Sequence, residues 1–197
     1  FLRPTRGRII FKGQDITALP ASDIARLGMA RSFQVSSVFP HMTVIENVRV
    51  ALQRRRGDSF DFWRSGNVLS RYDEEAVSLL AEVGLEDMYG LKASELSYGR
   101  KRALEIATTL ALDPEMLLLD EPMAGLGHED VDRIARLIRR IAVNRTILMV
   151  EHNLSVVASL SDTITVLARG KVLAEGGYDV VSKDPHVIEA YIGAGHD

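Results

Sequence analysis

The chain has 197 residues, 46% of them hydrophobic and 26% charged, a composition typical of globular domains. Its formal net charge of −3 gives no electrostatic support for a nucleic-acid partner. It contains no cysteine, which excludes disulfides, thiolate zinc sites and cysteine nucleophiles, and no apolar run approaches the roughly 18 residues of a membrane span.

The first forty residues predict a hairpin, a helix and a buried strand. Two short extended stretches in GRIIFKGQDI (7–16) flank a turn at Lys12-Gly13. Pro20 and Gly28 delimit a short helix over 19–28, because proline suits a first helical turn and glycine a helix end. A short strand is predicted over MARSFQ (29–34), ending at Gln34.

Residues 43–113 have helical patterns. Thr43 and Glu46 form a capping box, which predicts a helix from about 44 to 53. Apolar spacing predicts a helix over 71–85, closed by Gly84, and another within 95–114 that starts after Ser97. This block is expected to interrupt the sheet as a separate helical lobe.

The last third alternates strands and helices. The uninterrupted apolar runs MLLLD (116–120) and TILMV (146–150) predict strands buried on both faces. The other predicted elements are helices over 128–143 and 153–161, two strands within 163–176, and a final helix from Pro185. This alternation predicts an α/β fold with a mostly parallel sheet flanked by helices.

Acidic and imidazole side chains follow two of these strands. Asp120-Glu121 comes directly after the first strand and Glu151-His152 after the second. Ligands of open α/β sheets bind at the carboxyl ends of strands, where these groups are expected to meet a hydrated Mg²⁺ and a polyphosphate. The alternative is that Asp120 caps the next helix and Glu121 is merely exposed.

A second candidate site lies at a helix start. Ser97, Tyr98 and Gly99 precede the helical pattern, and Arg100 and Lys101 follow directly. Free backbone N–H groups, the helix dipole and a hydroxyl would together bind an anion there. The alternative is a plain serine N-cap.

These motifs together resemble those of the nucleotide-binding subunits of ATP-binding cassette (ABC) transporters. LSYGRKRALEIA (96–107) resembles the signature motif, with Tyr98 where glycine is usual, and MLLLDEP (116–122) resembles the Walker B strand. RSFQ resembles the Q-loop, VEHNL the switch-histidine motif and AGLGHED the D-loop, with Gly127 in place of the usual Asp or Asn. Their order and spacing match over essentially the whole chain.

The resemblance implies roles for single residues. Asp120 would hold Mg²⁺, with Gln34 sensing the metal and the attacking water and linking the site to the membrane subunit. Glu121 would be the general base, and His152 would contact the γ-phosphate of ATP. The signature segment, Ser97, Tyr98, Gly99 and Arg100, would bind an ATP held by a second nucleotide-binding subunit, so that hydrolysis needs a homo- or heterodimer.

The resemblance also implies a domain plan, a P-loop NTPase-like fold over residues 1–197. A RecA-like core would comprise 1–40 and 114–197, with a small antiparallel β region, and a helical signature subdomain would comprise 41–113. Residues 184–197 would form a family-specific tail. No stretch matches the phosphate-binding pattern G-x-x-x-x-G-K-[ST], and we expect that loop, the first strands and an adenine-stacking aromatic to be missing from the N-terminus.

Several stretches, among them VFPHMTVIENVRVA and DPHVIEAYIG, resemble the cassette subunits of branched-chain amino acid importers. The implied protein is an ATPase at the cytoplasmic face of the inner membrane, bound peripherally to permease subunits and served by a solute-binding protein. The alternatives are an importer of urea, amides or another small solute, and a non-catalytic truncated cassette that only docks. A cassette that acts on DNA or ribosomes is disfavoured by the acidic balance and the short chain.

Overall fold

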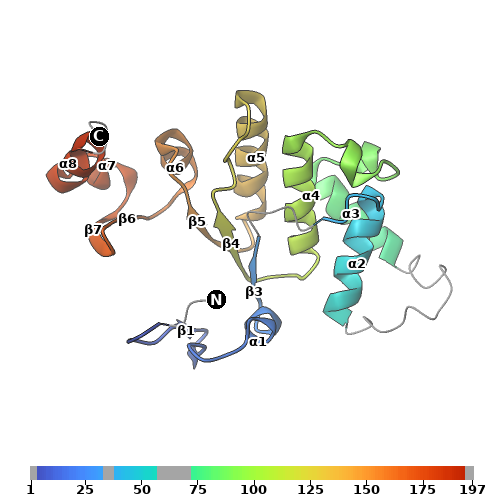
Figure 1. The fold of residues 1–197 in the computed structure, drawn as a ribbon, viewed down its shortest axis with the longest axis horizontal. Helices are drawn as coiled ribbons and strands as arrows, with labels where there is room; N and C mark the ends of the chain where they lie inside the picture. Colours follow the sequence, from blue (N-terminus) through green and yellow to red (C-terminus); the bar gives the residue numbers. More distant parts are fainter. Residues whose placement is uncertain (1–3, 33–37, 57–71, 194–197) are drawn as a thin grey trace. The chain divides into compact units, whose positions relative to one another are not determined.

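The computed structural model describes residues 4–32, 38–56 and 72–193 (Figure 1). They fall into two compact units, residues 1–150 and 151–197, which are described separately.

The first unit is built on a parallel three-stranded sheet. Its strands are β3 (Met29–Arg31), β4 (Met116–Asp120) and β5 (Thr146–Val150), in the order β3-β4-β5. Because the strands are parallel, their carboxyl ends share one edge, and Asp120 pairs with Val150 there. The predicted parallel sheet is therefore confirmed.

The two faces of this sheet differ in burial. Leu117 and Leu119 on one face are 0% and 2% exposed. On the other face, Leu148 and Val150 are 56% and 60% exposed. Among the described residues, the prediction of burial on both faces is therefore wrong for β5, whereas Leu118 of β4 is half-buried on this second face.

Three helices of the first unit pack against one another (Figure 1). They are α2 (Val44–Arg56), α3 (Asp73–Val83) and α4 (Tyr98–Leu110). Their core includes the fully buried side chains of Leu52, Leu80 and Leu104. Helix α2 runs three residues beyond the predicted end, and two short 3₁₀ turns, η3 (Glu86–Met88) and η4 (Ala93–Glu95), lead into α4.

The predicted helix signals act as expected. The backbone N–H of Thr43 donates to Glu46 Oε2 at 2.7 Å, and the N–H of Glu46 donates to Thr43 Oγ1 at 3.3 Å. These reciprocal bonds satisfy donors that a helix start leaves unpaired. Gly84 ends α3 in the left-handed conformation, with a φ of 73°.

The remaining elements of this unit precede or follow the sheet strands. Helix α5 buries an apolar stripe that comprises Ile134, Leu137, Ile138 and Ile141. Helix α5 spans His128–Ile141. The N-terminal elements are β1 (Ile10–Phe11), β2 (Gln14–Asp15) and α1 (Ala21–Arg26). Strands β1 and β2 form the predicted hairpin.

The second unit contains an antiparallel pair of strands and three helices. Its elements are α6 (Leu154–Leu160), β6 (Ile164–Ala168), β7 (Lys171–Gly176), α7 (Tyr178–Val181) and α8 (Pro185–Gly193). Helix α7 was not predicted, because four residues are too few to show helical periodicity. None of the helices described in either unit combines the length and the apolar character needed to cross a bilayer.

Candidate functional site

Asp120 lies at the carboxyl end of β4, and a cation meets its carboxylate. Arg31 Nη2 donates to Asp120 Oδ2 at 2.8 Å. Arg31 is the last residue of β3 and pairs with Leu118, which shares a sheet face with Asp120. The sequence analysis missed Arg31, although a parallel register between these two strands would have placed it beside Asp120.

The Asp120 carboxylate suits a hydrated Mg²⁺. Its side chain is 28% exposed, so a ligand can reach it. Among the described residues there is no group of three His, Asp or Glu side chains that could hold a metal ion. Mg²⁺ needs fewer protein ligands than that, since it keeps several waters and binds through one or two carboxylates and substrate phosphates. The partly exposed Asp120 carboxylate is therefore compatible with a hydrated Mg²⁺, and the metal itself stays a prediction.

Glu121 sits on a sharp corner directly after β4. Its φ is 44°, in the left-handed region that side chains other than glycine rarely adopt. Its backbone N–H donates to the carbonyl of Val150 at 2.9 Å. Strained backbone of this kind concentrates at functional sites, where the surroundings hold it in place.

A buried arginine from α4 binds this corner. Arg102 is 8% exposed, and its guanidinium donates to the main-chain carbonyls of Asp120 (3.2 Å), Glu121 (3.0 Å) and Pro122 (3.2 Å). Its Nη1 also donates to Glu105 Oε2 at 2.9 Å. Arg102 was not predicted as a site residue, because a charged residue within a helical pattern usually indicates a solvated face.

The start of α4 makes close contacts with the segment after β4. An added Cβ on Gly99 would lie 2.2 Å from Asp130 Cγ, a distance that no side chain tolerates. The ring of exposed Tyr98 lies against Gly125. Ser97 occupies the N-cap position, yet its side chain makes no capping hydrogen bond. The hydroxyl therefore does not cap the helix, as the alternative interpretation required. Arg100, in the first turn of α4, is half-buried.

His152 belongs to the second unit and is exposed. The Glu151 carboxylate accepts from the backbone N–H groups of His152 (3.1 Å) and Asn153 (3.3 Å). Asn153 in turn caps α6 by accepting from Ser155 and Val156. Because Glu121 belongs to the first unit, the expected meeting of Glu121 and His152 remains a prediction. Gln34 lies outside the described residues.

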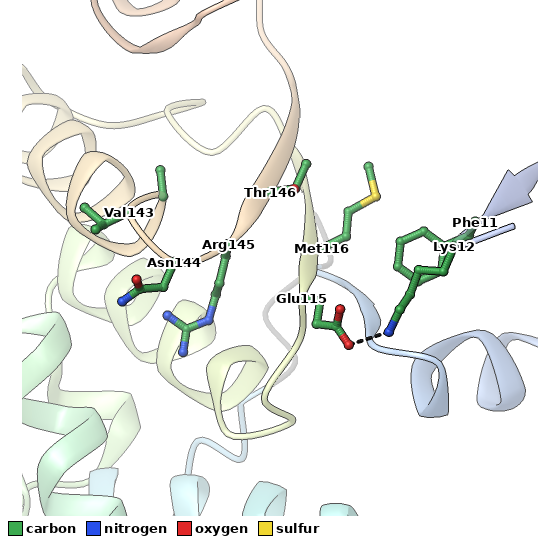
Figure 2. Close-up of a pocket in the computed structure, with 9 residues that line it drawn as sticks. Phe11, Lys12, Glu115, Met116, Val143, Asn144, Arg145 and Thr146 are labelled. Atoms are coloured by element: carbon green, nitrogen blue, oxygen red, sulfur yellow. Dashed lines mark hydrogen bonds and ion pairs between the residues drawn. The ribbon is translucent and has the colours of Figure 1, made fainter.

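The pocket found in the first unit lies at the other edge of the sheet. Figure 2 shows it beside Met116 and Thr146, the first residues of β4 and β5. Lys12 Nζ and Glu115 Oε1 form an ion pair across it at 2.5 Å. We place the candidate site at the carboxyl edge instead, because Asp120, Glu121 and the start of α4 supply the chemistry there.

Comparison with known proteins identifies the family. The family model described as ABC transporter matches residues 1–124, and one described as branched-chain amino acid ATP-binding cassette transporter matches residues 171–197. The chain belongs to the ABC transporter family. Its fold is that of an ABC ATPase cassette, as predicted.

Curated relatives resemble almost the whole chain. The high-affinity branched-chain amino acid transport ATP-binding protein BraF of Pseudomonas aeruginosa is 37% identical, over 98% of this chain and 78% of the relative. The corresponding protein LivG of Escherichia coli is 38% identical, with the same coverage. A lipopolysaccharide export system ATP-binding protein, LptB of Acidithiobacillus ferridurans, is 34% identical over 98% of this chain and 76% of the relative.

Solved structures agree with the fold. An ATP-binding cassette of an ABC transporter in its ADP conformation matches with a TM-score of 0.80 and 29% identity, over 98% of this chain and 79% of that one. A nucleotide-free cassette matches with a TM-score of 0.78 and 28% identity, with the same coverage.

Proposed function

We propose that this chain is the ATP-binding and ATP-hydrolysing subunit of an ABC importer for branched-chain amino acids. The observation that carries the activity is the corner after β4, where Asp120 ends the strand and Glu121 is held in a strained conformation. Phosphoryl transfer requires positioning and charge neutralisation more than covalent chemistry, and this corner supplies both an acid for a metal and an acid for water.

Each predicted site residue has one role in this proposal. Asp120 would hold Mg²⁺, which would neutralise phosphate charge when bound, and Gln34 would contact the metal and the attacking water. Glu121 accepts the proton of that water, and His152 contacts the γ-phosphate. Ser97, Tyr98, Gly99 and Arg100 receive the nucleotide of a second subunit at the start of α4, where free N–H groups favour an anion.

The solute assignment rests on the C-terminal match and on the printed names of the relatives. Residues 171–197 match a family model for branched-chain amino acid cassettes, and BraF and LivG carry that transport in their names. These observations favour branched-chain amino acids over urea or amides. The subunit would act at the cytoplasmic face of the inner membrane, with a homo- or heterodimeric partner, permease subunits and, indirectly, a solute-binding protein.

Replacing Glu121 tests the activity. We expect Glu121→Gln in the full-length protein to lower the rate of ATP hydrolysis by roughly 10²-fold or more, because the general base is lost. Phosphate release measures this rate. Glu115→Gln, one residue before the opposite end of β4, is the control and should leave the rate unchanged. An unchanged rate in Glu121→Gln would remove this residue from the mechanism.

ATP binding by the 197-residue chain itself is a separate prediction. The sequence has no match to the phosphate-binding pattern, so we expect no saturable ATP binding by residues 1–197 in isothermal calorimetry. Micromolar binding would show that other residues hold the phosphates, and the non-catalytic docking alternative would then lose its support.

A further inference from the structure

The contacts of Arg102 go beyond those of an ordinary ion pair. Three of its four described hydrogen bonds go to successive main-chain carbonyls, those of Asp120, Glu121 and Pro122, at 3.0–3.2 Å. The fourth goes to Glu105, three residues along α4. The guanidinium of Arg102 thus joins helix α4 to the segment that carries Asp120 and Glu121.

Charge balance alone does not explain this arrangement. A buried cation needs a counter-charge, and Glu105, whose side chain is 5% exposed, provides it through Nη1. Nε and Nη2 remain, and both bind carbonyls of the corner. The planar fork of arginine can satisfy acceptors in several directions at once, which the compact ammonium of lysine cannot.

The bound carbonyls matter because Glu121 is strained. A left-handed residue with a side chain is strained, and it persists where the surroundings over-determine its conformation. Here both main-chain polar groups of Glu121 are fixed. Its N–H donates to Val150 at 2.9 Å, and its carbonyl accepts from Arg102 at 3.0 Å and from the N–H of Ala124 at 3.1 Å. Arg102 therefore supplies one of these three main-chain hydrogen bonds, and the one among them that comes from a side chain.

We propose that Arg102 is a positioning residue for Glu121. Its guanidinium fixes the main chain from Asp120 to Pro122 so that the Glu121 carboxylate meets the attacking water. This inference rests on the proposed function of Glu121 as general base. Because Ser97 and Gly99 begin the same helix, Arg102 also ties the nucleotide-facing start of α4 to this corner.

The test compares Arg102→Lys with wild type in the full-length protein. Lysine keeps a positive charge for Glu105 but cannot span three carbonyls. We expect kcat for ATP hydrolysis to fall about 10- to 100-fold, because a misplacement of about 1 Å costs that much. KM for ATP should stay within about twofold, since the described hydrogen bonds of Arg102 go to Glu105 and to the main chain of the corner. Arg145→Lys is the control, because Arg145 is also partly buried and ion-paired but lies before β5, and it should leave kcat unchanged.

A double substitution separates this inference from the proposed function. If Arg102 acts through Glu121, then adding Arg102→Lys to Glu121→Gln should lower the residual single-turnover rate no further. A loss that multiplies the two single effects would overturn the positioning role. An unchanged rate in Glu121→Gln alone would instead overturn the proposed function of Glu121, whatever Arg102 does.

Two further outcomes would overturn the inference. Wild-type kcat in Arg102→Lys would do so, and so would a rise in KM with kcat unchanged. Should Arg102→Lys fail to fold, Arg102→Gln combined with Glu105→Gln carries the same test. That pair strands no buried charge, and its expected result is the same loss of kcat.

Discussion

The contact between Gly99 and Asp130 is the tightest approach that a glycine makes in the described residues. An added methyl group would overlap the Asp130 carboxyl carbon at 2.2 Å. The Asp130 carboxylate also forms an ion pair with Arg133 on the same helix, which a rotation away from Gly99 would disturb. The start of α4 can therefore pack closely against the start of α5 because residue 99 has no side chain.

We expect Gly99→Ala to destabilise the protein by about 1–3 kcal/mol, the usual cost of overpacking, although alanine favours a helix. Urea denaturation measures the change. Gly90→Ala is the control, because nothing lies within 4 Å of its added Cβ. Asp130→Ala should rescue Gly99→Ala in part by removing the clashing carboxyl group. Equal stability of Gly99→Ala and wild type would contradict the close contact.

At this scale the sequence predicts which residues are chemically apt, but not their partners. Asp120 and Glu121 stand out, because two acids directly after an apolar run need an explanation. Arg31 and Arg102, which bind Asp120 and its neighbours, lie 89 and 18 residues away in the chain. Their roles depend on strand register and helix packing, which no local pattern contains.

Among the elements, the capping box at the start of α2 has a measurable pH dependence. The backbone N–H of Thr43, and then its hydroxyl, hold the pKa of Glu46 below its ordinary value of 4.5. Because the pKa is lower in the folded state, this stabilisation is present above pH 4.5. It is lost as the pH falls through the folded-state pKa.

We therefore expect Glu46→Gln to destabilise the protein by about 0.3–1 kcal/mol at pH 7, the scale of a charge near a helix N-terminus, because glutamine can keep the hydrogen bond but not the charge. The difference from wild type should shrink as the pH falls below 4.5. Urea titrations at several pH values measure it. Glu74→Gln is the control, because Glu74 is an exposed acid in the first turn of α3 outside any capping box. A difference independent of pH would rule out the carboxylate as its source.

Elements with strong local signals were predicted well. The strands β4 and β5 have the predicted bounds, and α3 ends at the predicted glycine. Helix α7 was missed, since it is too short for periodicity to be visible. Burial of β5 on both faces was predicted wrongly, because an apolar run indicates what a strand could bury and not what covers it.

At the scale of the whole molecule, the proposal divides each nucleotide site between two subunits. One subunit would contribute Asp120 and Glu121, and the other would contribute the start of α4. A substitution at Glu121 would then damage the part of the site that one subunit contributes. A substitution at the start of α4 would damage the part that the other subunit contributes. Two defective subunits could therefore restore one intact site between them.

In the full-length protein, we expect a mixture of Ser97→Arg and Glu121→Gln subunits to hydrolyse ATP at about a quarter of the wild-type rate, since half of the dimers are mixed and each has one intact site. Each variant alone should be nearly inactive. The subunit with both substitutions, mixed with Glu121→Gln, is the control and should remain inactive. Hydrolysis by the first mixture no faster than by the control would contradict a site shared by two copies of this chain.

The uncovered sheet face has a practical consequence for handling this chain. Leu148 and Val150 are more than half exposed at neighbouring positions on one face of β5, so the described residues present an apolar surface to water. A dye that fluoresces on apolar surfaces should bind there. We expect Leu148→Thr to lower the dye fluorescence without unfolding the chain. An unchanged dye signal in Leu148→Thr would show that these side chains are not the surface that the dye binds.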